Sequence, residues 1–94
     1  MAKSILKNDR ECFVCGNIYG LDKHHIYGGG NRQVSEQNGF WCYLCKRHHT
    51  RTIYSVHGDP GHRLDKELKA LCQAVYEKDH TREDFIKLIG KSYR

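Results

Sequence analysis

The 94-residue sequence has little of the apolar material that large or membrane-spanning proteins contain. Only 38% of its residues are hydrophobic, proline, tryptophan and methionine each occur once, and the mean hydropathy is −0.77. A chain this short forms one small domain and leaves no room for a second independent core. No run approaches the roughly 18 consecutive apolar residues that a membrane span needs, so we expect a soluble protein with no membrane partner.

Two other features are missing. Residues 1–10 contain no long apolar stretch, which argues against a secretory signal and favours a reducing, cytoplasmic location. No block of five or six like charges occurs, which excludes a long charged binding tail. The net charge is nevertheless +5, and residues 1–63 carry nine bases and five acids, a balance of +4. This balance is compatible with a polyanionic partner but does not by itself establish one.

The cysteines do not fit a disulfide framework. There are five of them, an odd number, and they occur together with seven histidines. Two pairs have the Cys-x-x-Cys spacing that is typical of metal sites in reducing compartments. We therefore expect a metal site, with zinc as the default ion. Such an ion also helps a domain of this size, whose hydrophobic core alone stabilises it weakly.

The chain changes character near Arg63. From Leu64 to about Lys78, apolar residues recur at the spacing of one helical face, which predicts an amphipathic helix. Thr81, followed three residues later by an aspartate, suggests the N-cap of a second helix, and Gly90 suits the position that ends it. We expect a single domain over residues 1–94, in which 64–94 is a C-terminal helical extension.

The first 63 residues predict a different kind of secondary structure, with short strands and glycine-rich loops. Leu21–Tyr27 and Phe40–Leu44 have the aromatic and β-branched content of two short strands, and a glycine run follows the first strand. Helix signals resume near Cys45 and run to about Tyr54. The predicted order is therefore knuckle, strand, loop, strand and three helices, an α+β fold.

Cys12 and Cys15 form one half of a zinc knuckle, and two pairings compete for the other half. Cys42 with Cys45 would make a four-cysteine site, whereas Cys45 with His48 would make a site of three cysteines and one histidine. If Cys45 opens a helix, Cys45 and His48 stand one turn apart and point together, so we favour the second pairing. Cys42 would then be a small buried apolar residue.

Four features together carry a resemblance to a known family. They are a Cys-x-x-Cys knuckle, a His-His-Ile strand, a following asparagine and a Leu-Cys segment that opens a helix. Here they read Cys12-Phe13-Val14-Cys15, His24-His25-Ile26, Asn38, and Leu44-Cys45-Lys46-Arg47-His48-His49. The sequence in this respect resembles the HNH, or ββα-metal, endonucleases, with His48 standing where a second cysteine is usual. The resemblance implies a small zinc-stabilised ββα-metal domain, formed by residues 1–63, with two C-terminal helices.

A narrower likeness covers nearly the whole chain. It extends over His24-His25-Ile26, Gly30-Asn31-Arg32, Ser35-Glu36, Leu44-Cys45, His48-His49, Val56-His57, Leu64-Asp65 and Gly90. In these residues the chain looks like small phage HNH proteins related to the recombination-associated, RecA-dependent Ref nuclease. That likeness implies a phage or prophage protein acting in the cytoplasm of a bacterial host. It also suggests that a recombinase could be a partner, although the sequence alone does not support one.

The family resemblance assigns catalytic roles to four residues. His24 and His49 would hold a divalent ion, Mg²⁺ or Mn²⁺, and His25 would act as general base on a water molecule. An imidazole near its ordinary pKa of about 6.5 can accept that proton at neutral pH. Asn38 would fix His25 through a hydrogen bond, with Asn31 as the substitute because Asn38 precedes a glycine.

The start of the predicted helix permits two metal sites. Residues three and four positions after Cys45 lie on either side of it, so His48 can lean toward the knuckle and His49 toward the strand. The alternative, one mixed site with a spare histidine, remains open. His57 is either a third ligand of the catalytic ion or, as we favour, a surface imidazole, and His62 and His80 are expected to be solvated.

Four bases flank the predicted site, where each either contacts a phosphate of DNA or belongs to a solvated basic face: Arg32, Lys46, Arg47 and Arg51. Phosphate contacts give affinity without sequence choice, so we expect weak specificity. A double-strand break from one such site would need two visits or a homodimer. The alternative hypothesis is a noncatalytic zinc module that binds nucleic acid or a protein, in which the other histidines are incidental.

Overall fold

The computed structural model of the chain describes the backbone of residues 2–51 and 63–94, and the side chains of residues 2–49 and 63–94. Its centre is a two-stranded antiparallel sheet of β1 (Leu21–His25) and β2 (Trp41–Cys45). The register sets His24 opposite Cys42. Both predicted strands are confirmed, although β1 ends before Ile26 and β2 continues to Cys45. The α+β class predicted from the sequence is therefore correct.

The predicted loop between the strands is wrong, because a helix lies there. A 3₁₀ turn, η1 (Gly29–Asn31), leads into the seven-residue helix α1 (Arg32–Asn38). Ser35 is fully buried in α1, donates its hydroxyl to the carbonyl of Tyr27 at 2.7 Å and accepts the Tyr27 amide. Gly39 ends the helix with a left-handed φ of 76°. A helix this short and polar has too few apolar residues to be detected by periodicity.

The helix predicted from Cys45 to about Tyr54 is partly replaced. Cys45 is the last residue of β2, and the described helical segment that follows is the single π-helical turn η2 (Arg47–Arg51). Turns of this kind occur most often at functional sites. The rest of the predicted helix, together with His57 and His62, lies outside the described residues.

The two C-terminal helices are confirmed as α2 (Arg63–Tyr76) and α3 (Arg82–Ile89). Thr81 forms a full capping box, in which its hydroxyl accepts the Asp84 amide and the Asp84 carboxylate accepts the Thr81 amide. Gly90 closes α3 in a left-handed conformation, with a φ of 108°. No helix among the described residues is long and apolar enough to cross a membrane.

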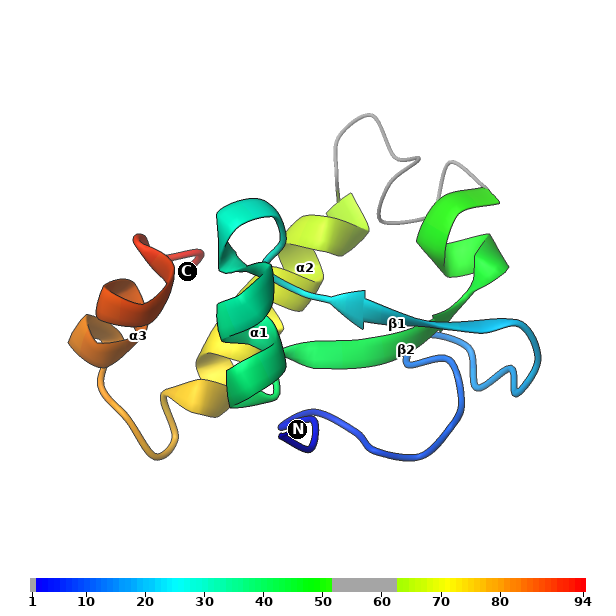
Figure 1. Cartoon of the computed structure of the whole chain (residues 1–94), viewed down its shortest axis with the longest axis horizontal. Coiled ribbons are helices and arrows are strands. Elements are labelled where there is room, and N and C mark those ends of the chain that lie inside the picture. The colour runs from blue at the N-terminus through cyan, green and yellow to red at the C-terminus, as the bar shows by residue number, and fades with distance from the viewer. Residues whose placement is uncertain (1, 52–62) are drawn as a thin grey trace.

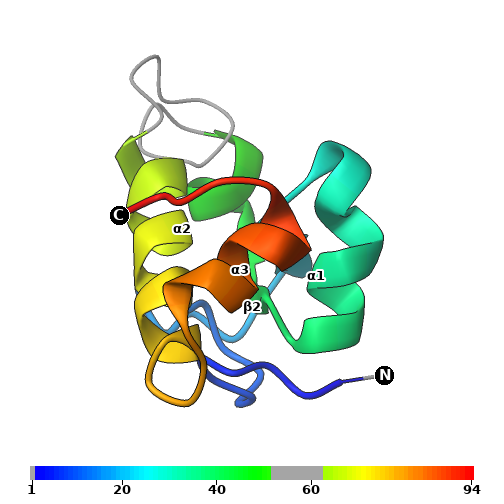
Figure 2. The same cartoon turned by 90° about the vertical axis from the view of Figure 1, so that its left-hand side faces the viewer.

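α1 and α2 flank the strands, and α3 lies between these two helices at one end of the molecule (Figures 1 and 2). One core unites the two parts of the chain, because Tyr27 and Phe40 beside the sheet contact Phe85 of α3. Cys42 and Cys72 are both fully buried in this core. Burial raises the pKa of each of these thiols to about 12, so both stay protonated at neutral pH.

Candidate functional site

Three cysteines and one histidine converge at one end of the sheet. Cys12 and Cys15 come from the N-terminal knuckle, Cys45 ends β2 and His48 lies in η2. Their ligand atoms all lie within 4.8 Å of one another. We call these four residues the Cys₃His cluster. The knuckle is fixed locally by the Gly16 amide, which donates to the Cys12 carbonyl at 2.8 Å.

The spacing of the four ligand atoms fits a tetrahedral ion. A zinc ion with bonds of about 2.1 to 2.3 Å places its ligand atoms roughly 3.5 to 3.8 Å apart. Here the Cys45 sulfur lies 3.3 Å from Nδ1 of His48, the Cys12 sulfur lies 3.6 Å from the same nitrogen, and the Cys15 and Cys45 sulfurs are 3.8 Å apart. The Cys₃His cluster can therefore hold a zinc-like metal ion.

The thiolate form is favoured at Cys12 but not at Cys15, where a backbone hydrogen bond is outweighed by burial and the neighbouring thiols, which raise the pKa. Burial acts to raise the pKa of Cys12, but backbone amides of Cys45 and Cys15 hydrogen-bond to its sulfur, and the net effect lowers the pKa. Cys42 lies outside the cluster in the hydrophobic core. Of the two pairings considered, the structure thus supports Cys45 with His48 and gives Cys42 the role of a buried apolar residue.

Two histidines form a second group beside the Cys₃His cluster. The rings of His24 in β1 and His49 in η2 lie edge to face, with centroids 5.4 Å apart. Two imidazoles that bind one ion through bonds of about 2.1 Å have centroids roughly 5 Å apart. The separation of the two rings is close to this value, and adjacent residues of η2 belong to different groups, His48 to the Cys₃His cluster and His49 to the His24–His49 pair.

Asp22 supports the His24–His49 pair and was missed by the sequence analysis. Its carboxylate lies 3.0 Å from Nδ1 of His49 and also contacts the Lys46 ammonium. The Lys46 hydrogen bond, and after it the His49 hydrogen bond, lower the pKa of Asp22. Histidines that ligate metals commonly have a carboxylate on the other ring nitrogen. A signal was present, because Asp22 and His24 are two residues apart on a strand and share a face.

His25 has different partners on the opposite face of β1. Its Nε2 lies 2.9 Å from the Glu36 carboxylate of α1, which also accepts Lys23 at 2.8 Å. The Lys23 hydrogen bond, followed by that of His25, lowers the pKa of Glu36 and keeps it ionised. Glu36 was missed as a functional residue because α1 was not foreseen.

The expected hydrogen bond between Asn38 and His25 is wrong. Asn38 ends α1 and donates its side-chain amide to the Val34 carbonyl at 2.8 Å, so it caps its own helix. Its proposed substitute, Asn31, donates to the Ile89 carbonyl at 2.9 Å and ties η1 to α3. The position expected for an asparagine beside His25 is occupied by Glu36.

A cavity of about 350 Å³ adjoins both histidines of β1. Its lining includes His24 and His25, the glycines that follow Tyr27, and residues Asp65, Lys69 and Tyr93 of the C-terminal part. This volume lies within the range of small-molecule sites. A second, more open hollow of about 530 Å³ lies on the other side of His25 and is lined by Arg32 and Glu36.

The four bases predicted to bind DNA differ in their surroundings. Arg32 is exposed at the start of α1 and lines the open hollow beside His25. Arg47 is exposed in η2. Lys46 is half-exposed and contacts Asp22, while the Arg51 side chain lies outside the described part of the chain. Of the three bases whose side chains are described, Arg32 is thus the one that shares the open hollow with His25.

Comparisons with protein-family models, with curated proteins and with solved structures find no significant match for this chain.

Proposed function

We propose that this protein is a metal-dependent endonuclease of the ββα-metal, or HNH, type that hydrolyses DNA phosphodiester bonds. The proposal depends above all on one observation, the pairing of the His24 and His49 rings at 5.4 Å. His25 lines a cavity that His24 also lines. The Cys₃His cluster is then a structural zinc site that fixes η2, the turn that presents His49.

The proposed reaction requires a nucleophile, neutralisation of phosphate charge and help for the leaving oxygen. A divalent ion, Mg²⁺ or Mn²⁺, held by His24 and His49 would supply the last two. Asp22 holds the His49 ring in the orientation that binding requires, through the 3.0 Å contact to Nδ1.

His25 is the proposed general base. Glu36 hydrogen-bonds to its Nε2 at 2.9 Å, so Nδ1 is the atom that accepts the proton of the attacking water. The Glu36 carboxylate fixes the ring and stabilises the imidazolium that forms. Glu36 thus takes the orienting role that the sequence had suggested for Asn38.

The proposed substrate is DNA, bound mainly through its phosphates. The chain carries a net charge of +5, and Arg32 lines the hollow beside His25. Such contacts neutralise phosphates without reading bases, so cleavage with weak sequence choice is expected.

The test is a nicking assay on supercoiled plasmid with added Mg²⁺ or Mn²⁺. We expect wild type to nick, and His25→Ala to lose about 10²- to 10⁴-fold, the usual contribution of a general base. The matched control is His80→Ala, because His80 is exposed and stacks on Tyr76, outside both histidine groups. Folded, zinc-loaded wild type that leaves plasmid intact with every divalent ion would refute the proposal.

Metal stoichiometry separates this function from a noncatalytic zinc module. A nuclease should hold one tightly bound zinc and a second, exchangeable ion, and His24→Ala and His49→Ala should remove only the second. A single zinc per chain that neither substitution affects would favour the binding module. Elemental analysis before and after mild chelation measures both ions.

A further inference from the structure

The cavity beside the histidines continues toward the C-terminus. The 350 Å³ cavity shares three lining residues, Asp65, Lys69 and Tyr93, with a neighbouring groove of about 510 Å³. The two hollows therefore adjoin, with Tyr93 between the one beside His24 and His25 and the one over α2. We call the two hollows together the C-terminal groove.

The far part of the C-terminal groove is basic. Its lining carries four cationic side chains against one carboxylate, a balance of +3: Lys66, Lys69, Lys91, Arg94 and Asp65. Asp65 pairs with Lys69 at 2.8 Å, and Arg94 pairs with Glu77 at 3.2 Å. Among the described residues, the exposed Lys66 and Lys91 form no ion pair with a carboxylate, so both are available to an incoming anion.

Tyr93 is the aromatic wall between the two hollows. The ammonium groups of Lys69 and Lys91 lie 5.3 and 4.9 Å from the centroid of its ring. The ring also packs against Tyr27, with centroids 5.4 Å apart. An aromatic face with two mobile cations near it suits a base and the phosphates beside that base.

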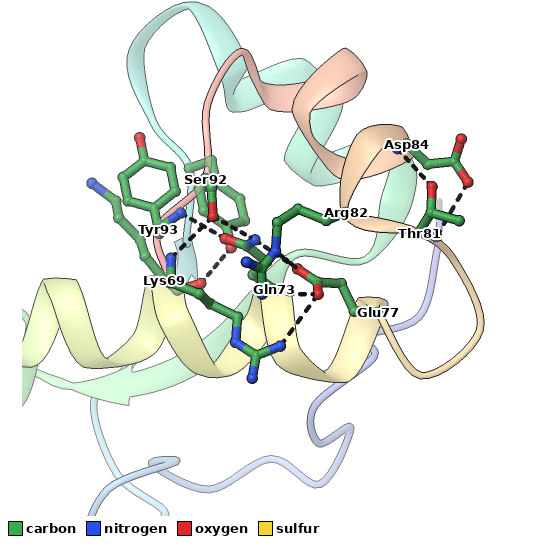
Figure 3. A network of polar contacts seen from close by, with 10 residues as sticks. Lys69, Gln73, Glu77, Thr81, Arg82, Asp84, Ser92 and Tyr93 are labelled. Carbon is green, nitrogen blue, oxygen red and sulfur yellow. Dashed lines mark hydrogen bonds and ion pairs between the residues drawn. The ribbon is translucent and has the colours of Figure 1, made fainter.

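Tyr93 is held in place by the buried side-chain amide of Gln73 (Figure 3). Gln73 of α2 is fully buried, and its Oε1 accepts the Tyr93 backbone amide at 2.6 Å. Its Nε2 donates to Ser92 at 2.9 Å and to Glu77 at 2.6 Å. A buried amide with both ends satisfied fixes one geometry, so the Tyr93 segment is ordered before any ligand arrives.

We propose that the C-terminal groove binds an unpaired nucleic-acid strand next to the scissile phosphate, with one base stacked on Tyr93 and phosphates on Lys66, Lys69 and Lys91. This inference rests on the proposed function, because the histidines mark where the strand is cut. A stacked base takes the place of the Lys91 ammonium, which moves to a phosphate.

The arrangement favours a single strand over a duplex. A base in a duplex is already stacked on its neighbours, whereas an unpaired base presents a free face to an aromatic ring. The walls of the 350 Å³ cavity come from β1, α2 and the C-terminal segment, and its volume suits one nucleotide. The groove thus assigns a binding role to a segment for which the sequence had predicted only helices.

Fluorescence anisotropy with a labelled oligothymidylate of about 12 nucleotides tests the proposal, using the zinc-loaded full chain without added Mg²⁺ or Mn²⁺. We expect Tyr93→Leu to weaken binding roughly tenfold, the loss of one stacked base. Tyr93→Phe keeps the ring and should bind as wild type does. Binding of the same sequence as a duplex should be weaker and insensitive to Tyr93→Leu.

A pair of double variants tests the cations while the Tyr93 side chain itself is kept. Lys66→Gln/Lys91→Gln should reduce the slope of log affinity against log salt by about 1.4, since each phosphate contact on a single strand contributes about 0.7. Lys78→Gln/Lys87→Gln removes the same charge from exposed positions outside the groove and should leave the slope unchanged.

Undiminished binding by folded Tyr93→Leu, or an equal loss of slope in both double variants, overturns the proposal. The binding assay is independent of cleavage. A wild type that nicks plasmid but binds the strand without regard to Tyr93 refutes the groove alone. A wild type that binds through Tyr93 and never nicks DNA refutes the nuclease alone.

Discussion

The Cys₃His cluster and the His24–His49 pair are neighbours that share the turn η2, yet they are built differently. In the cluster, four ligand atoms from three chain segments lie within 4.8 Å of one another, and three of their separations are 3.3 to 3.8 Å, close to those around a tetrahedral zinc ion. In the pair, two rings meet, and Asp22 orients one of them. Structural metal sites are closed in the first way, whereas catalytic sites keep positions for water and substrate.

The difference shows how one turn can supply both kinds of site. A complete set of ligands anchors η2 and, with it, the ring of His49. The neighbouring histidine can then remain in an incomplete set, because its position does not depend on the ion it is proposed to bind. Under the proposed function, adjacent residues would thereby serve stability (His48) and chemistry (His49).

The largest expected effect comes from removing one ligand of the Cys₃His cluster, because only this group is expected to support the fold. Cys45→Ala should abolish zinc binding and cooperative unfolding, because structural zinc contributes on the order of 10 kcal/mol to the folding of small domains. The matched control is Cys42→Ala, on the same strand and equally buried but outside the cluster. It should keep one zinc and lose about 1 kcal/mol.

Thermal unfolding and elemental analysis of the two variants give the answer. Loss of zinc from both variants would mean that the ligand set is the four-cysteine alternative, since Cys42 is a ligand only in that set.

A second variant addresses the His24–His49 pair alone. Asp22→Asn should weaken the binding of the exchangeable ion by about 10- to 100-fold, since it removes the carboxylate that orients His49. Titration with Mn²⁺ measures this affinity. The tightly bound zinc should be unchanged, and a parallel loss of zinc would show that the two groups are not separable. Asp9→Asn, at an exposed acid, is the control.

Glu36→Gln sharpens the contrast between binding and catalysis. The amide keeps the size of the side chain but cannot stabilise an imidazolium at His25, so we expect nicking to fall about tenfold with Mn²⁺ affinity unchanged. A change in metal affinity instead of rate would place Glu36 with the His24–His49 pair rather than with the base. Comparing single-turnover rates at saturating Mn²⁺ separates these outcomes.

The smallest expected effect comes from a position remote from both groups. Thr81→Ala removes the capping box of α3 and should cost about 1 kcal/mol with metal content unchanged. The Thr81 amide lowers the pKa of Asp84, so its contribution is present above the unfolded pKa, about 3.9, and is lost as pH falls through the lower folded value. The substitution keeps this amide but removes the Thr81 hydroxyl, which also lowers the pKa of Asp84, so the stability deficit of the variant in urea unfolding should narrow slightly in strong acid.

Part of this structure was predictable because its signals are local. The spacing of Cys12, Cys15, Cys45 and His48 pointed to the cluster that the structure assembles. The stripe of α2 and the ends of α3 followed from periodicity and capping residues. Leu71 is an exception, since it is one of the apolar residues that recur at the helical spacing between Leu64 and Lys78, yet it is 41% exposed. Helix periodicity identifies which residues lie on the apolar face of a helix, but it does not show how many of those residues the packing partner covers.

The rest depended on contacts between distant segments. Glu36 reaches His25 only because residues 32–38 form a helix, and that helix depends on the burial of Ser35 under Tyr27. Tyr93 reaches the cavity only because Gln73 holds it from α2. Neither arrangement leaves a periodic pattern in the sequence.

The π-helical geometry of η2 has a consequence for how this chain tolerates change in length. In an α-helix each residue turns the chain by about 100°, so losing one residue from the wide turn would rotate everything after the deletion by a comparable angle. His48 and His49 could no longer face separate partners, and both groups would fail together. Point substitutions at the exposed Arg47 should therefore have little effect on metal binding. Deletion of this single residue should disrupt both the Cys₃His cluster and the His24–His49 pair.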